Sequence, residues 1–288
     1  MSGFTLPSAS LLSQSILSGV FVGALYGLMG LGVSLSWGLL RLINLAHFAF
    51  AFLAAYLCYQ MATMGVDPLL TLVVIVPTFF ALGAGLHWVM ARFAVTPFNS
   101  LLLTFGLMGI VEAIIQTIWT ADFRKLESSY AQQKFKVGTL FVPVPEFITL
   151  LLAVGISVTV WAVLRYTDLG KAMRAAAEDA PIASAFGVNQ ARNALLLAGL
   201  CSALASIAGV CLALSFTLAP SQMYAWIGVV FAAVMLGGLG RALGPLIAGT
   251  VIGVSEAITM AVTAPSWAPI VSFTLLIVIL VLRPGRAS

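Results

Sequence analysis

Long apolar stretches separated by short polar ones run along most of the chain. A helix of about 20 apolar residues crosses the hydrocarbon core of a bilayer, and nine stretches are near that length or somewhat shorter. Six are clear, and the C-terminal part holds two or three more, because Gly237, Gly238 and Gly240 before Pro245 predict a break there. The pattern predicts an all-α, polytopic helical membrane protein with 8 to 9 transmembrane helices. The expected spans are 11–36, 43–64, 69–90, 101–120, 147–164, 193–218, 224–236, 246–262 and 267–282.

Composition supports a membrane protein of one domain. Hydrophobic residues make up 61% of the chain and charged residues 8%, whereas soluble domains are about half apolar and about a quarter charged. The apolar runs are too long for the alternating strands of a membrane β-barrel. We expect a single transmembrane domain over residues 1–288.

The basic residues predict how the chain is oriented, since short cytoplasmic loops are enriched in Lys and Arg. With the N-terminus outside and nine crossings, nine of the thirteen basic residues lie inside. With eight crossings, Arg241 would lie in a re-entrant turn and the terminal arginines outside. We favour nine crossings. The basic residues then placed inside are Arg41, Arg92, Arg165, Lys171, Arg174, Arg192, Arg241, Arg283 and Arg286.

The stretch "GKAMRAAAEDAPIASAFGVNQAR" concentrates charge in an otherwise apolar chain. Thr167 or Asp168 can cap a first helix, and Asp179 can cap a second that ends at Gly187. On the first helix, Lys171, Arg174 and Glu178 share one face, and Met173, Ala176, Ala177 and Ala180 line another. Spacing alone leaves two interpretations, a solvated loop that sets topology and a pair of helices that docks on a partner.

Four segments carry a resemblance to a known family. "LGKAMRAAAEDAPIASAFGVNQARNALLLAGLCSALASIAGV" resembles the cytoplasmic loop and following span of branched-chain amino acid ABC transporter permeases of the LIV type. "WGLLRLINLAHFAF", "LLLTFGLMGIVEAI" and "FAAVMLGGLGRALGPLIAGTVIGVSEAI" agree with it in the family's order, over nearly the whole chain. The resemblance implies that residues 166–192 form a cytoplasmic coupling loop for an ATPase. The coupling candidates are Gly170, Lys171, Arg174, Glu178, Asp179 and Gly187.

The resemblance also implies the partners. A permease of this family pairs with a like or related second permease subunit, binds two ATP-binding cassette subunits and receives solute from an extracytoplasmic binding protein. It works in the bacterial inner membrane by alternating access, on branched-chain or other amino acids, urea, amides or small aromatic acids. The chain has no phosphate-binding loop sequence, so ATP hydrolysis is expected on partner chains. We expect no cofactor, metal site, catalytic set or nucleic-acid partner.

Polar residues inside the predicted spans are candidates for the translocation path. Asn44 and His47 lie three apart on one helical face, where each needs a hydrogen-bond partner. They could line the path or brace a neighbouring helix, and the same alternatives hold for Thr104 and Glu112. Phe48 stands where the family usually has glycine, followed often by an acidic residue, which puts the family's usual substrate in question.

Two intramembrane carboxylates leave a different function open. An ionised carboxylate within a span costs about 2.5 to 3.5 kcal/mol, so Glu112 and Glu256 must be neutral, paired or facing water. Pairing with Arg41, Arg241 or His87 would satisfy them. As an alternative, the chain would be a self-sufficient secondary transporter or channel with Glu112 or Glu256 as its ion site. Many secondary transporters contain two matching broken helices, one in each half of the chain. This sequence contains one glycine-rich break and no clear second copy of it.

Glycines spaced by four predict close contact between helices. Gly19, Gly23 and Gly27 form one such row, and Gly249 with Gly253 forms another. The sequence leaves open whether these faces meet within the chain or contact another subunit.

Overall fold

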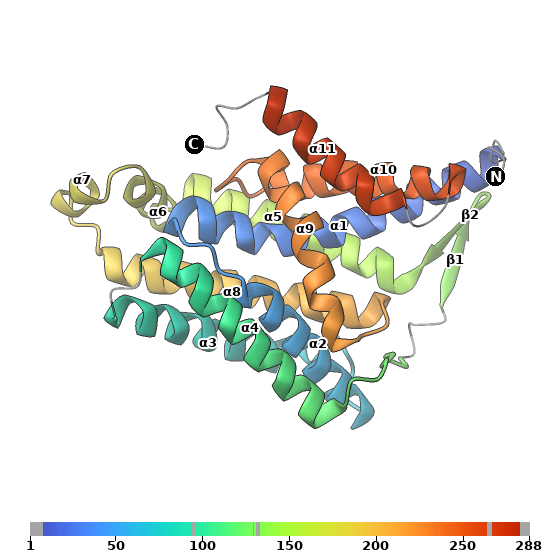
Figure 1. Ribbon diagram of the computed structural model, residues 1–288, viewed down its shortest axis with the longest axis horizontal. Coiled ribbons are helices and arrows are strands. Elements are labelled where there is room, and N and C mark those ends of the chain that lie inside the picture. Colours follow the sequence, from blue (N-terminus) through green and yellow to red (C-terminus); the bar gives the residue numbers. More distant parts are fainter. Residues whose placement is uncertain (1–7, 94–95, 129, 131–132, 264–266, 283–288) are drawn as a thin grey trace.

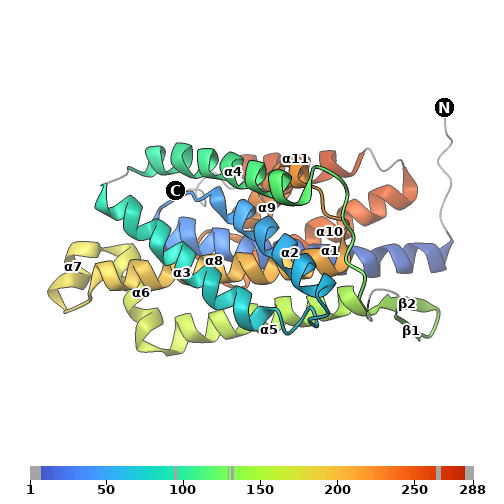
Figure 2. The same cartoon turned by 90° about the horizontal axis from the view of Figure 1, so that it is seen from below.

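The computed structural model describes residues 8–93, 96–128, 130, 133–263 and 267–282. Most of the long helices run along the longest axis of the molecule (Figures 1 and 2). The C-terminal arginines, Arg283 and Arg286, lie outside the described residues. The elements are α1 (Ala9–Leu40), α2 (Ala46–Thr63), α3 (Leu72–Arg92), α4 (Pro97–Trp119), β1 (Lys134–Val137), β2 (Leu140–Pro143), α5 (Val144–Tyr166), α6 (Asp168–Glu178), α7 (Ala180–Ala185), α8 (Gln190–Ser215), η1 (Pro220–Gln222), α9 (Met223–Gly237), α10 (Gly244–Val262) and α11 (Ala268–Leu282).

Seven helices in the described part of the chain are long and apolar enough to cross a membrane. They are α1, α3, α4, α5, α8, α9 together with η1, and α10. The two other predicted spans correspond to α2, with 18 residues, and α11, with 15 residues. The prediction of a polytopic helical membrane protein is therefore confirmed, and the count of 8 to 9 crossings stays a prediction.

The glycine rows meet within the chain, where α1 packs against α10. A Cβ atom placed on Gly23 would lie 2.5 Å from the Gly249 carbonyl oxygen, and one on Gly19 would lie 2.7 Å from the Gly253 oxygen. Both neighbours are backbone atoms, so only glycine allows this approach. The α1–α10 pair thus forms a close-packed contact inside one subunit.

The turn between α9 and α10 explains the glycine-rich break. Gly238 and Gly240 adopt φ values of +91° and +71°, which side chains disfavour. The Ser34 hydroxyl donates to the Gly238 carbonyl oxygen at 3.2 Å, and the Gly240 amide donates to the Ser34 carbonyl oxygen at 2.9 Å. The break is a tight turn held on the side of α1.

A β-hairpin that the sequence analysis missed lies in the longest loop. Strands β1 and β2 pair in antiparallel fashion, with Phe135 opposite Val142. The Gln14 side chain donates to the Phe141 carbonyl oxygen at 2.9 Å and accepts from its amide at 3.0 Å. The hairpin and the start of α1 therefore share one end of the molecule, the hairpin end, and α6 and α7 project at the other (Figure 1).

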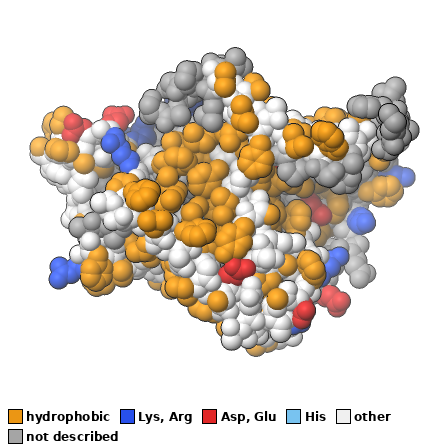
Figure 3. Space-filling view, viewed as in Figure 1, with side chains coloured by type: hydrophobic (Ala, Val, Ile, Leu, Met, Phe, Trp, Pro, Cys, Tyr) orange, Lys and Arg blue, Asp and Glu red, His pale blue; other side chains and the backbone are white. Residues whose placement is uncertain are grey.

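The face of the bundle seen in Figure 3 exposes large apolar side chains, and the charged side chains on this face lie mostly toward the two ends of the molecule. On α4, Phe105 is 52% and Ile110 59% exposed, and on α11 Ile277 is 61% exposed. Such apolar surface is typical of a face covered by lipid or by another membrane subunit.

Candidate functional site

The segment 166–192 folds into the two short helices that the sequence predicts. The Thr167 hydroxyl accepts from the Gly170 amide at 3.1 Å and starts α6, while the Asp179 carboxylate accepts from the Ile182 amide at 2.9 Å and starts α7. Gly187, the second residue after the end of α7, adopts a φ of +87°. Because each boundary has its own cap, the two helices form a defined unit, which we call the α6–α7 unit.

The two faces of α6 differ as expected. Met173 is buried, whereas Lys171, Arg174 and Glu178 are exposed. Lys171 pairs with Asp168 at 3.1 Å, but both side chains are largely exposed, so the pair adds little stability. The charged face of α6 is thus open for contact with another chain, while Ala180, expected on the apolar face, is exposed.

Gly170 lets α6 begin directly against the end of α5. A Cβ atom there would collide with the backbone of Val163 and Leu164. This close approach places Met173 beside the buried side chains of Leu164 and Leu197. A movement of α6 would therefore displace side chains at the end of α5 and near the start of α8.

Arg41 joins the α6–α7 unit to the end of α1. Its guanidinium donates to the Ala177 carbonyl oxygen, in the last turn of α6, at 2.8 Å. Its own backbone has a φ of +56°, a left-handed conformation uncommon for a residue with a side chain. The sequence marked Arg41 as a topology signal but gave no sign of this contact, which joins positions 136 residues apart.

The segment after Arg41 leads back along α1 before α2 begins. The Ser36 hydroxyl donates to the Leu42 carbonyl oxygen at 3.2 Å, which holds this segment against the last turns of α1. A ring nitrogen of His47, in the first turn of α2, lies 3.0 Å from the Met29 carbonyl oxygen, two or more turns before the end of α1. Helix α2 therefore starts beside the middle of α1 and away from its end.

Four of the five path candidates gather at this start of α2. His47, Phe48 and Thr104 are 2%, 0% and 0% exposed. The Thr104 hydroxyl accepts from the Leu45 amide at 3.1 Å and so ties α4 to the turn before α2. In this conformation His47 and Thr104 act as braces between helices, and the path role stays a prediction.

Asn44 differs from these neighbours because its side-chain oxygen is buried and has no hydrogen-bond partner among the described residues. It lines a cavity of about 20 Å³ together with Ser36 and His87. This polar cavity has room for about one water molecule, which is the kind of partner that a buried side-chain oxygen commonly has.

The two intramembrane carboxylates have partners other than the basic residues that the sequence suggested. Glu112 accepts from the Tyr224 hydroxyl at 2.7 Å and from the Gln116 amide at 3.1 Å. Glu256, 7% exposed, accepts from the Tyr26 hydroxyl at 3.0 Å and from the Ser272 hydroxyl. Glu256 thereby joins α10 to α1 and α11, and Glu112 joins α4 to α9, apart from the cluster at the start of α2.

No group of three or more His, Cys, Asp or Glu side chains in the described residues could hold a metal ion. The candidate site consists of the α6–α7 unit, the Arg41 contact and the start of α2. This arrangement links a polar surface at one end of the molecule to a polar cluster between the helices.

Comparison with known proteins identifies the family. A family model described as "Branched-chain amino acid transport system / permease component" matches residues 15–280. The high-affinity branched-chain amino acid transport system permease protein LivH of Salmonella typhimurium is 30% identical over 292 residues, covering 94% of this chain and 93% of that protein. The permease protein BraD of Pseudomonas aeruginosa, from a system of the same description, is 26% identical over 295 residues and 94% of each chain. No solved structure matches the chain. The chain belongs to the family of branched-chain amino acid transport permeases and is a multi-pass transport subunit.

Proposed function

We propose that this chain is the membrane-spanning subunit of an ABC importer in a bacterial inner membrane and that it carries branched-chain or related amino acids inward. It pairs with a second permease subunit, either a copy of itself or a related chain. Two separate ATPase subunits drive it, and an extracytoplasmic binding protein delivers the solute. The relatives named as branched-chain amino acid permeases support this substrate class.

The observation that carries the proposal is the α6–α7 unit. It projects at one end of the bundle (Figure 1), with Arg174 and Glu178 on its exposed face and Met173 buried beneath. A solvated loop that only set topology would need neither capped helices nor a buried apolar side chain. The unit has the form of a rigid element on which an ATPase can dock and push.

The same geometry suggests how the push reaches the membrane helices. Docking on α6 moves the Ala177 carbonyl, to which Arg41 is bonded. Arg41 begins the connection that carries Asn44 and His47 at the start of α2. In alternating access the ATPase cycle would thus shift this connection relative to α1.

Nine crossings with the α6–α7 end inside fit this proposal best. Arg165, Arg174 and Arg241 line one groove at that end, which agrees with the excess of arginine in short cytoplasmic loops. An eight-crossing chain with Arg241 in a re-entrant turn would separate Arg241 from the other two.

The test is affinity purification of the tagged chain from its native membrane in mild detergent, followed by identification of the proteins that accompany it. We expect an ATPase subunit with the wild type and its loss in the double variant Arg174→Glu, Glu178→Arg, which reverses both charges on the exposed face of α6. Arg92→Glu is the control, because Arg92 is an exposed residue at the end of α3 outside the α6–α7 unit.

Two results would contradict the proposal. One is an ATPase that stays bound to the double variant as well as to the wild type, which removes the docking role of α6. The other is a purified chain that moves solute across vesicles without any ATPase, which makes it a secondary transporter.

A further inference from the structure

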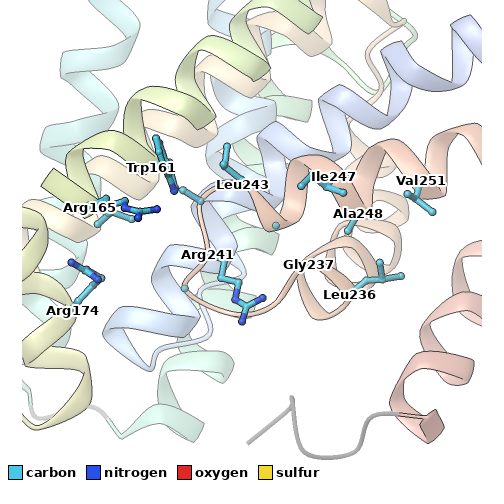
Figure 4. Close-up of a pocket in the computed structure, with 14 residues that line it drawn as sticks. Trp161, Arg165, Arg174, Leu236, Gly237, Arg241, Leu243, Ile247, Ala248 and Val251 are labelled. Atoms are coloured by element: carbon cyan, nitrogen blue, oxygen red, sulfur yellow. The ribbon is translucent and has the colours of Figure 1, made fainter.

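A groove of about 720 Å³ opens between the C-terminal end of α5, the middle of α6 and the turn that joins α9 to α10. Figure 4 shows Arg165 on α5, Arg174 on α6 and Arg241 on the turn around this space. Arg165 and Arg174 flank the junction of α5 and α6, and the fold places Arg241, from a distant part of the chain, in the same groove.

The charge of the groove is uncompensated within the described chain. None of the described lining residues is acidic, and none of the three arginines forms an ion pair with a described residue. The guanidinium of Arg165 lies 5.4 Å from the Trp161 ring centre and 5.7 Å from that of Tyr166. This contact with two rings orients Arg165 and leaves its donors available for an anion.

The rest of the groove is apolar and continues along α10 (Figure 4). Ile247 and Val251 lie one turn apart on that helix and are 64% and 47% exposed. Trp161 closes the opposite side, and an indole ring favours the membrane interface. The three arginines therefore form a cationic rim, and Ile247 and Val251 form an apolar strip next to it. An amphiphile with an anionic headgroup would complement both surfaces.

We propose that this groove binds an anionic phospholipid, with its phosphate between Arg165, Arg174 and Arg241 and an acyl chain along Ile247 and Val251 of α10. Basic pockets between transmembrane helices on the cytoplasmic side are suited to such headgroups. A free phosphate would use the arginines but not the apolar strip, and an acidic protein segment would not need exposed apolar residues that run along a span. The inference rests on the proposed orientation, which places this end of the molecule in the cytoplasm. Arg174 also belongs to the face of α6 proposed for the ATPase, whereas Arg165, Arg241 and the apolar strip lie outside the α6–α7 unit.

The test is native mass spectrometry of the purified chain titrated with phosphatidylglycerol or with phosphatidylcholine of the same acyl chains. We expect tighter binding of phosphatidylglycerol, and a loss of about fivefold in its affinity for each of Arg165→Gln and Arg241→Gln, from roughly 1 kcal/mol per arginine at a membrane surface. Arg92→Gln is the control, because it removes an exposed arginine outside the groove. Arg174 is left unchanged because α6 also serves the proposed coupling.

A second measurement tests whether the acyl chain lies along α10. Phosphatidylglycerol with brominated acyl chains should quench tryptophan fluorescence in vesicles, and Trp161→Phe should remove part of that quenching while keeping a ring for Arg165. Ile247→Asn should weaken lipid binding without changing the charge of the groove. Brominated phosphatidylcholine is the control, because general contact of Trp161 with the bilayer would give equal quenching by both lipids.

Four outcomes would overturn the proposal. If the chain binds phosphatidylcholine as tightly as phosphatidylglycerol, the groove does not recognise the headgroup. If Arg92→Gln lowers the affinity for phosphatidylglycerol as much as Arg165→Gln and Arg241→Gln do, the effect comes from general surface charge. Displacement of the lipid by soluble glycerol phosphate at comparable concentration identifies a site for a water-soluble anion. Loss of the lipid when the partner subunits bind assigns the groove to a protein interface.

Discussion

The α1–α10 pair and the α6–α7 unit are attached to the molecule in opposite ways. On α1 and α10, rows of glycines bring two backbones together along several turns, so that a single added methyl group at Gly23 would meet the backbone around Gly249. The α6–α7 unit instead contacts the bundle at separate points: the buried Met173, the close approach at Gly170 and the hydrogen bond from Arg41. The Gln190 side chain of α8 also donates to the Ala180 carbonyl oxygen and the Ser184 hydroxyl of α7. Few contacts hold it, and most of its charged side chains are exposed.

This difference predicts separate mechanical roles. Closely packed helices resist sliding, because their side chains and backbones fit only in one arrangement. Segments with few buried contacts open or shift at lower free energy. The α1–α10 pair is therefore expected to move as one body, and in the proposed cycle the α6–α7 unit and the α1–α2 connection shift relative to it.

The largest loss of stability is expected from the substitution Gly23→Ala. The new Cβ would lie 2.5 Å from the Gly249 oxygen and from the Thr250 Cα, and since these are backbone atoms the helices must separate. We expect a loss of about 3 kcal/mol in the free energy of unfolding, at the upper end for overpacking. Thermal unfolding in detergent, followed by circular dichroism, measures it.

Gly109→Ala on α4 is the matched control, because a Cβ atom there has open space around it. Alanine favours a helix over glycine by about 1 kcal/mol, so this variant should be as stable as the wild type or slightly more. Equal destabilisation by both substitutions would refute the close packing of α1 with α10.

The next largest loss of stability is expected from substitutions of Glu256, which joins the α1–α10 pair to α11. Glu256→Leu leaves the hydroxyls of Tyr26 and Ser272 without their acceptor, at an expected cost of about 2 kcal/mol in unfolding free energy. Glu256→Gln keeps a carbonyl acceptor and should cost less than about 1 kcal/mol. Transport by the glutamine variant should remain near that of the wild type in reconstituted vesicles. A stable Glu256→Gln protein that transports nothing would favour an ion site at this carboxylate.

The sequence predicted the parts of this molecule that depend on local pattern. The apolar runs gave the helices, and Thr167, Asp179 and Gly187 marked the boundaries of α6 and α7 because caps depend on nearby residues. Spacing by four also predicted the glycine faces, though their partner was visible only in the fold.

Contacts between distant residues could not be predicted in this way. The hydrogen bond from Arg41 to Ala177 and that from Tyr26 to Glu256 join residues 136 and 230 positions apart. Nothing in the local pattern distinguishes Arg41 from an arginine that only sets topology. The hairpin of β1 and β2 was missed because each strand has four residues, too few for a clear alternating pattern.

A smaller loss of stability is expected from Arg41→Gln, which removes the hydrogen bond between the end of α1 and the α6–α7 unit. The variant loses an exposed, charge-assisted hydrogen bond of about 1 kcal/mol, so ATP-driven uptake in vesicles with the partner subunits should fall roughly fivefold. Arg41→Lys, which keeps a cationic donor, should retain most of the uptake. ATPase binding should be unchanged in both, and a loss of the ATPase from Arg41→Gln would mean that Arg41 serves docking and not transmission.

The smallest change in overall stability is expected from Asp179→Ala, which removes the cap of α7. The Ile182 amide loses its acceptor, at a cost of about 1 kcal/mol confined to that helix. Hydrogen exchange of the α7 amides should become about fivefold faster, while the thermal midpoint of the whole chain stays constant. Asp168→Ala is the control, since the exposed pair of Asp168 with Lys171 contributes little. If Asp179→Ala lowered the thermal midpoint as much as Gly23→Ala, the α6–α7 unit would belong to the same cooperative body as α1 and α10, and its role as a separate moving part would fail.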